Sequence, residues 1–146
     1  MTVRVYLVRH GAAEPQGPGG DAARRLTPAG RAEFEAHLGA LGAVLAPARV
    51  LSSPLVRARE TAALLAASAR APLVQEPALR SGASGGRALL ALARRKGAGT
   101  ALVGHNPEIA EAIALAAGRE LSVPPGAVAA VDLDGAVARL AWLRAP

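Results

Sequence analysis

The sequence predicts an α/β fold: a mostly parallel, doubly wound sheet with helices on both faces and an antiparallel edge strand. Short β-type runs alternate with helical stretches rich in Ala, Leu and Arg, as expected for parallel strands joined by crossover helices. The last part of the chain differs, because Asp134-Gly135 between two apolar runs is a hairpin signal. With 146 residues, 51% of them hydrophobic, the chain suits a single domain spanning residues 1–146.

Each element follows from its local pattern. Three helices are expected to begin at a capping side chain followed by proline, at Thr27-Pro28, Ser53-Pro54 and Asn106-Pro107. One strand of the hairpin formed by 127–133 and 136–143 is expected to be the antiparallel edge. His37 lies in a helical stretch without a motif around it and is expected to be solvated. The remaining strands are predicted near 2–8, 48–51, 72–75 and 100–103, and the helices near 28–45, 54–69, 84–96 and 107–117.

Polar residues that could take part in catalysis or binding follow three of these strands. His10 ends the first strand between Arg9 and Gly11, and His105 ends the strand over 100–103. Arg57 lies at the start of the helix that follows the strand over 48–51. Ligands of open α/β sheets bind outside the carboxyl ends of the strands, so these side chains are predicted to share one crevice. A histidine beside a fixed positive charge suits nucleophilic attack on phosphorus.

Together these motifs resemble the histidine phosphatase superfamily, also called the phosphoglycerate-mutase-like family. The resemblance is carried by Arg9-His10-Gly11, by the Ser-Ser-Pro-x-x-Arg-Ala-x-x-Thr-Ala stretch over 52–62, and by Gly104-His105-Asn106-Pro107. The stretch over 21–30, Asp-x-x-Arg-x-Leu-Thr-x-x-Gly, is similar to the short SixA-like phosphohistidine phosphatases. Three motifs in one order are a far more specific signal than any one alone.

The resemblance implies a catalytic set of His10, Arg9, Arg57 and His105. His10 would attack phosphorus and become phosphorylated, and water would then hydrolyse the phosphohistidine. The two guanidiniums would hold the equatorial oxygens, since their planar forks match that geometry. His105 would donate to the same group, as an imidazolium stabilised by the phosphate.

Three further residues are candidates for contacts with the substrate. The backbone amides near Gly11 and at the Ser53 helix start are expected to assist in binding the phosphate. Arg24 is either a surface charge or an outer contact to the phosphate.

The general acid is the part that the sequence does not assign. Many members carry a glutamate after a Leu-Arg pair, but here Leu79-Arg80 is followed by Ser81, and Glu76 lies nearby out of register. A missing acid favours a leaving group of low pKa such as imidazole, and a short chain without a lid would admit a histidine displayed on another protein. The expected substrate is therefore a phosphohistidine protein. The alternatives are a small-molecule phosphomonoesterase acting on a sugar, nucleotide or cofactor-precursor phosphate, and a non-catalytic phosphoprotein-binding module.

Composition argues against several other classes of function and site. The net charge of +6 suits a phosphorylated substrate, whereas scattered arginines and only one Tyr, one Phe and one Trp disfavour nucleic acid. The absence of cysteine excludes disulfides and zinc-thiolate sites, and no metal or other cofactor is expected. The first apolar run is too short and too interrupted for a signal peptide or a membrane span. The expected location is the cytoplasm.

Overall fold

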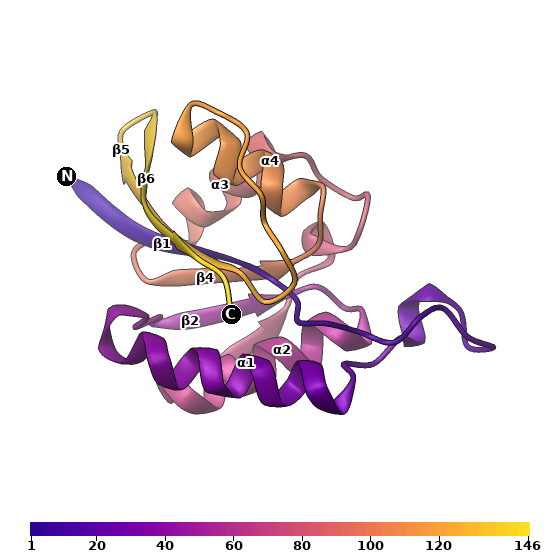
Figure 1. Ribbon diagram of the computed structural model, residues 1–146. Coiled ribbons are helices and arrows are strands. Elements are labelled where there is room, and N and C mark those ends of the chain that lie inside the picture. The colour runs from indigo at the N-terminus through magenta and orange to yellow at the C-terminus, as the bar shows by residue number, and fades with distance from the viewer.

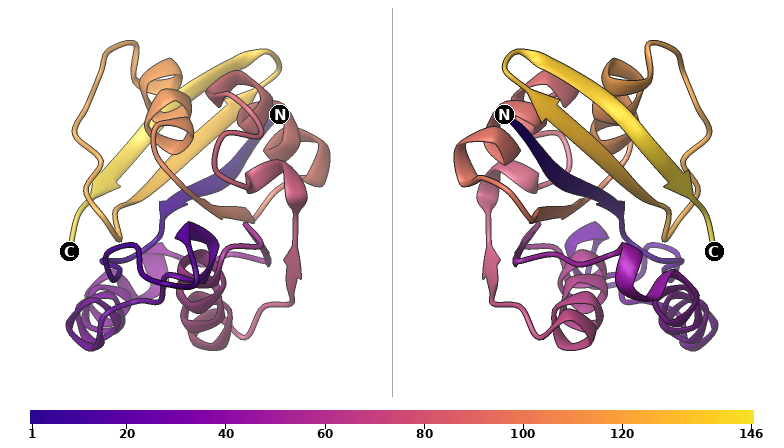
Figure 2. Two further views of the ribbon diagram at one scale, coloured as in Figure 1. Left: turned by 90° about the vertical axis from the view of Figure 1, so that its right-hand side faces the viewer. Right: turned by 90° about the vertical axis from the view of Figure 1, so that its left-hand side faces the viewer.

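The computed structural model describes all 146 residues and has one six-stranded sheet. Figures 1 and 2 show helices packed on both faces of this sheet. The strand order is β3-β2-β4-β1-β5-β6. The predicted α/β fold class is thereby confirmed. The elements are β1 (Thr2–Arg9), α1 (Pro28–Leu41), β2 (Arg49–Ser52), α2 (Val56–Ala69), β3 (Leu73–Gln75), α3 (Gly86–Lys96), β4 (Thr100–Gly104), α4 (Glu108–Ala117), β5 (Val128–Asp134) and β6 (Val137–Arg144), with short 3-10 helices η1 (Asp21–Ala23), η2 (Gly42–Val44) and η3 (Pro77–Leu79).

The sheet has a parallel half and an antiparallel half. Strands β3, β2, β4 and β1 run parallel, while β5 runs antiparallel to β1 and β6 antiparallel to β5. The sequence predicted one antiparallel edge strand, and the structure has two antiparallel strands. The reason is the tight turn at Gly135, whose φ of +60° lets β6 fold back along β5, while β5 itself pairs with β1.

Two cores, one on each face, hold the helices to the sheet. Val5 and Leu7 of β1 face the core shared with α3 and α4, whereas Tyr6 and Val8 face the core shared with α1 and α2. This alternation along one strand is what a sheet buried on both sides requires. In Figures 1 and 2, α1 and α2 accordingly lie together below the sheet, and α3 and α4 above it.

The helix ends depart from the expectation in α1, α2 and α4, and the N-cap of α4 is Pro107 and not Asn106. α1 starts as predicted, because the Thr27 hydroxyl accepts from the Gly30 amide at 2.9 Å, but it ends at Leu41 and not near 45. Gly42 follows with a φ of 54°, which terminates the helix. α2 starts at Val56, so Ser53 is not its N-cap. The Ser53 hydroxyl instead accepts from the Leu55 amide two residues on, which makes a turn before the helix begins.

His37 was expected in solvent, and this expectation is wrong. The side chain lies in α1 beside Phe34 and is only 7% exposed. Its Nε2 donates to the carbonyl oxygen of Arg144 at 3.1 Å, which satisfies the buried ring. Burial lowers the pKa of His37 from its ordinary value. None of the helices has the length and apolar character needed to cross a membrane.

Candidate functional site

The carboxyl ends of β1, β2 and β4 meet at one edge of the sheet and bring the two motif histidines together. Arg9 pairs with Gly104 in the parallel register, and the His10 amide donates to the Gly104 carbonyl at 3.1 Å. The chain leaves both strands at this point. The rings of His10 and His105 consequently lie 5.2 Å apart, between centroids, although 95 positions separate them in the sequence.

His10 is held as a neutral imidazole with a defined tautomer. Its Nδ1 lies 2.7 Å from the carbonyl oxygen of Gly11, which can only accept, so Nδ1 carries the proton. Nε2 therefore has the free lone pair, and the Arg57 Nε donates to it at 3.3 Å. The pKa of His10 is lowered to about 4, mainly by burial and to a smaller extent by the nearby guanidiniums of Arg57, Arg9 and Arg24.

His105, whose ring packs beside that of His10, is also neutral. Its Nε2 is 2.7 Å from the Ser53 hydroxyl, while its Nδ1 is buried without a partner. Burial first, and then the charges of His10 and Arg57, lower the pKa of His105 to about 3. His105 is thus a neutral imidazole in the free protein, whereas the imidazolium that the sequence predicts is one stabilised by a bound phosphate, whose negative charge would favour protonation.

Arg57 points into the site from the first turn of α2. The residue is 4% exposed, and all three of its nitrogens have partners. Besides the contact to His10, Nη1 donates to the Asp21 carbonyl at 2.8 Å and Nη2 to the Asp21 carboxylate at 3.1 Å. The guanidinium is therefore fixed in one orientation beside the His10 ring.

The other two arginines approach from different segments. Arg9 donates from Nη1 to the Val123 carbonyl at 3.0 Å, and its buried Nε has no acceptor. Arg24 donates from Nη1 to the Asp21 carboxylate at 3.0 Å and from Nε to the Glu14 carbonyl at 2.6 Å. Arg24 thus joins the cluster through Asp21, and is not an isolated surface charge. The Arg9 Nε is unusual as a buried donor without an acceptor, and a bound anion could satisfy it.

Gly11 and Ser53 contribute differently from the sequence expectation. The Gly11 amide donates to the Thr61 hydroxyl at 3.1 Å, so it is occupied in the free protein, while its carbonyl orients His10. Ser53 contacts His105 through its side chain. Sequence reasoning did not single out Thr61 for the site. Its position one helical turn after Arg57 in the second motif is the signal that could have found it.

Glu76 lies outside this cluster. It follows β3, which β2 and β4 separate from β1 in the sheet. Its carboxylate accepts from the Ala78 amide at 3.2 Å and caps η3. The Asp21 carboxylate acts on His105 and raises its pKa, and the pKa of Asp21 itself is lowered by Arg24 and Arg57, so that this carboxylate is ionised.

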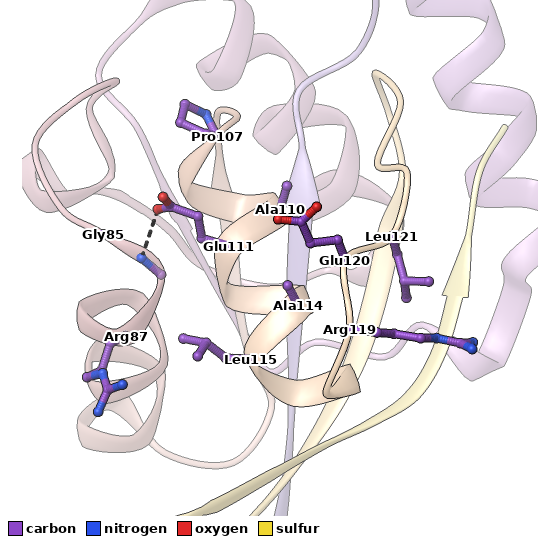
Figure 3. Close-up of a pocket in the computed structure, with 11 residues that line it drawn as sticks. Gly85, Arg87, Pro107, Ala110, Glu111, Ala114, Leu115, Arg119, Glu120 and Leu121 are labelled. Carbon is purple, nitrogen blue, oxygen red and sulfur yellow. Dashed lines mark hydrogen bonds between the residues drawn. The ribbon is translucent and has the colours of Figure 1, made fainter.

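A hollow of about 830 Å³ lies between the start of α3, the outer face of α4 and residues 119–121 (Figure 3). Ala110 and Ala114 form its floor, Leu115 and Leu121 line it, and none of the clustered histidines or arginines above contributes to it. Its nearest approach along the chain is Pro107, two residues after His105. No group of three potential metal ligands occurs anywhere in the structure.

Comparison with known proteins identifies the family. The model of the histidine phosphatase superfamily (branch 1) matches residues 5–88, which include His10 and Arg57. No curated protein has a significant sequence match to the chain.

Solved structures give the same result. The SixA protein of Agrobacterium tumefaciens, assigned as a phosphohistidine phosphatase, is 28% identical, with a TM-score of 0.85 and coverage of 99% of this chain and 98% of that one. The protein histidine phosphatase SixA complexed with tungstate is 26% identical, with a TM-score of 0.85 and coverage of 98% and 97%. A SixA from Nakamurella multipartitia is 25% identical, with a TM-score of 0.78 and coverage of 100% and 97%. The chain thus belongs to branch 1 of the histidine phosphatase superfamily and is a phosphatase.

Proposed function

We propose that the chain removes phosphoryl groups through a phosphohistidine intermediate on His10, and that its substrate is phosphohistidine on a protein. The observation that carries the proposal is the state of His10: a neutral imidazole whose Nε2 lone pair points at the Arg57 guanidinium. A nucleophile must keep a free electron pair at working pH, and burial among positive charges provides that here.

The surrounding charges fit a phosphoryl group. Arg9, Arg24 and Arg57 contribute three positive charges around His10, and Asp21 contributes one negative charge. The balance is an excess of positive charge, which matches the dianionic phosphoryl group of a phosphomonoester or phosphoramidate. The unpartnered Nε of Arg9 can donate to phosphoryl oxygens, because it lies buried without an acceptor.

The reaction would proceed in two displacements. In the first, the His10 Nε2 forms a bond to phosphorus while the bond from phosphorus to the leaving atom breaks, and that atom departs with the electron pair and takes up a proton from solvent. In the second, water attacks phosphorus and gives up a proton to solvent, the bond from phosphorus to the His10 Nε2 breaks and returns the electron pair to that nitrogen, and inorganic phosphate is released. The arginines hold the equatorial oxygens in both steps, since the developing charge lies there.

The leaving group decides between the candidate substrates. The Asp21 carboxylate is held ionised and cannot donate a proton, and Glu76 caps η3 away from the cluster. With neither of these two carboxylates as a proton donor, departure is easiest for a group with a low pKa, and imidazole at about 6.5 is far better than an alkoxide. This favours phosphohistidine over the alternative, a small-molecule phosphomonoesterase acting on alkyl phosphates of sugars, nucleotides or cofactor precursors.

The nucleophile is tested by rapid quenching with labelled substrate. Wild type should give an acid-labile, base-stable phosphoenzyme, and His10→Asn should give none and lose turnover. His37→Asn is the matched control, because His37 is an equally buried histidine outside the cluster, and it should still form the phosphoenzyme. Full turnover by His10→Asn would disprove the mechanism.

The substrate is tested by the dependence of kcat/KM on leaving-group pKa. Phosphohistidine protein and aryl phosphates should react well, and alkyl phosphates poorly, because no proton offsets the charge on the departing atom. Glu76→Gln should leave this slope unchanged. A shallow slope in wild type that steepens in Glu76→Gln would identify Glu76 as the acid and favour the small-molecule substrate.

A further inference from the structure

Asp21 occupies the anion-binding side of the arginine cluster in the free protein. Its carboxylate accepts from the Arg57 Nη2 at 3.1 Å with one oxygen and from the Arg24 Nη1 at 3.0 Å with the other. Two guanidiniums that converge on the oxygens of one anion form the arrangement by which arginines also bind phosphate. The same Arg57 reaches the nucleophilic Nε2 of His10 through its Nε. The carboxylate therefore lies where donors to a reacting phosphoryl group are needed.

We propose that Asp21 is an internal competitor for phosphate, bound to Arg57 and Arg24 in the free protein and displaced from Arg57 when a phosphoryl group enters. This inference rests on the proposed function, because it assumes that the phosphoryl group binds beside His10. A phosphoryl oxygen beside the His10 ring needs a donor from Arg57, whose Nη2 is held by the Asp21 carboxylate. The two anions compete for that nitrogen.

The exchange needs only a side-chain rotation. Arg57 also donates from Nη1 to the backbone carbonyl of Asp21 at 2.8 Å, and this contact can persist when the carboxylate leaves. The Asp21 side chain is 47% exposed, whereas that of Arg57 is 5% exposed. The released carboxylate can thus turn into water, while the arginine stays in position.

Competition by the Asp21 carboxylate would affect which phosphate compounds stay bound at the site. Inorganic phosphate is held by the contacts of the phosphate site alone, so a carboxylate on the same arginine donors weakens its binding and favours release of the product. A phosphoryl group carried on a larger substrate gains contacts elsewhere and can displace the carboxylate. Asp21 would therefore discriminate between attached and free phosphate.

Calorimetric titration with inorganic phosphate tests the proposal directly. Asp21→Asn and Asp21→Ala should each bind phosphate roughly 1.5–5-fold more tightly than wild type, as expected for loss of a half-exposed ion pair. Asp134→Asn is the matched control. It removes the same charge from the β5–β6 turn, where Asp134 pairs with the amino terminus at the far end of β1, and it should leave the affinity unchanged.

The outcomes separate this inference from the proposed function. Equal affinity for phosphate in wild type and both Asp21 variants would overturn the proposal that Asp21 competes with phosphate. Weaker binding in the variants would also overturn it, and would show that the carboxylate positions Arg57 for the phosphate. If phosphate bound neither wild type nor the variants, while all remained folded, the phosphate site itself would be wrong and both proposals would fall.

Discussion

Protonation of His10 should cost the folded protein much of its stability in mild acid. The pKa of His10 is lowered to about 4 in the fold, mainly by burial, against an ordinary value of 6.5. Between these values the unfolded chain binds a proton that the folded chain does not, so stability is complete above pH 6.5 and falls as the pH drops toward 4. Each pH unit is worth about 1.4 kcal/mol, so the loss approaches about 3 kcal/mol.

The assay is urea unfolding of wild type and His10→Asn at a series of pH values from 7.5 to 4.5. Other acid-sensitive groups, such as Asp21 and Asp132, are common to both proteins and largely cancel in the difference between them. The variant also removes the repulsion that His10 exerts on His105, which acts in the same direction. The free energy of unfolding should therefore fall less steeply with acid in the variant, by about 2–3 kcal/mol over the range.

If the difference in the free energy of unfolding between wild type and His10→Asn were the same at every pH, the argument would be refuted. His10 would then have the same pKa in the folded and the unfolded protein. Nuclear magnetic resonance of the ring nitrogens provides a second check. The spectra should show a His10 that stays neutral at pH 6, with its proton on the Nδ1 that faces the Gly11 carbonyl. A protonated ring at pH 6 would contradict the structure.

Three further predictions, one of them with a matched control substitution, have defined outcomes. Arg57→Lys keeps the charge but loses the planar fork, so kcat/KM should fall about 10²–10³-fold with the fold intact, and near-wild-type kinetics would argue against a role for the fork. Thr61→Val removes the acceptor of the buried Gly11 amide and should lower the free energy of unfolding by about 1–3 kcal/mol, whereas no change in urea unfolding would show that the amide finds another partner. Gly30→Ala would place a Cβ 2.2 Å from a carbonyl oxygen of the loop after β1, so it should lower the free energy of unfolding by about 1–3 kcal/mol. Gly39→Ala in the same helix has open space around it and should stabilise the protein slightly. A change of the same sign for both variants in thermal unfolding would contradict this.

Much of the fold was predictable because its signals are local. The alternation of apolar runs and helical stretches predicted every strand and α-helix, with errors of a few residues at the ends. Those errors have local causes of their own: Gly42 ends α1 early, and the turn at Ser53 delays α2. The second antiparallel strand was missed, because a hairpin pattern does not say how many of its strands join the sheet.

The sequence by itself determined the family, the nucleophile candidate and the arginines, because each motif is a short run in which residue type and spacing carry the chemistry. The tertiary structure decided what those residues do together. His37 is buried against a carbonyl 107 positions away, and Asp21 reaches Arg57 across 36 positions. Such contacts depend on how the helices pack on the sheet, as do the pKa values of His10 and His105, because burial and the sum of nearby charges exist only once the chain has folded.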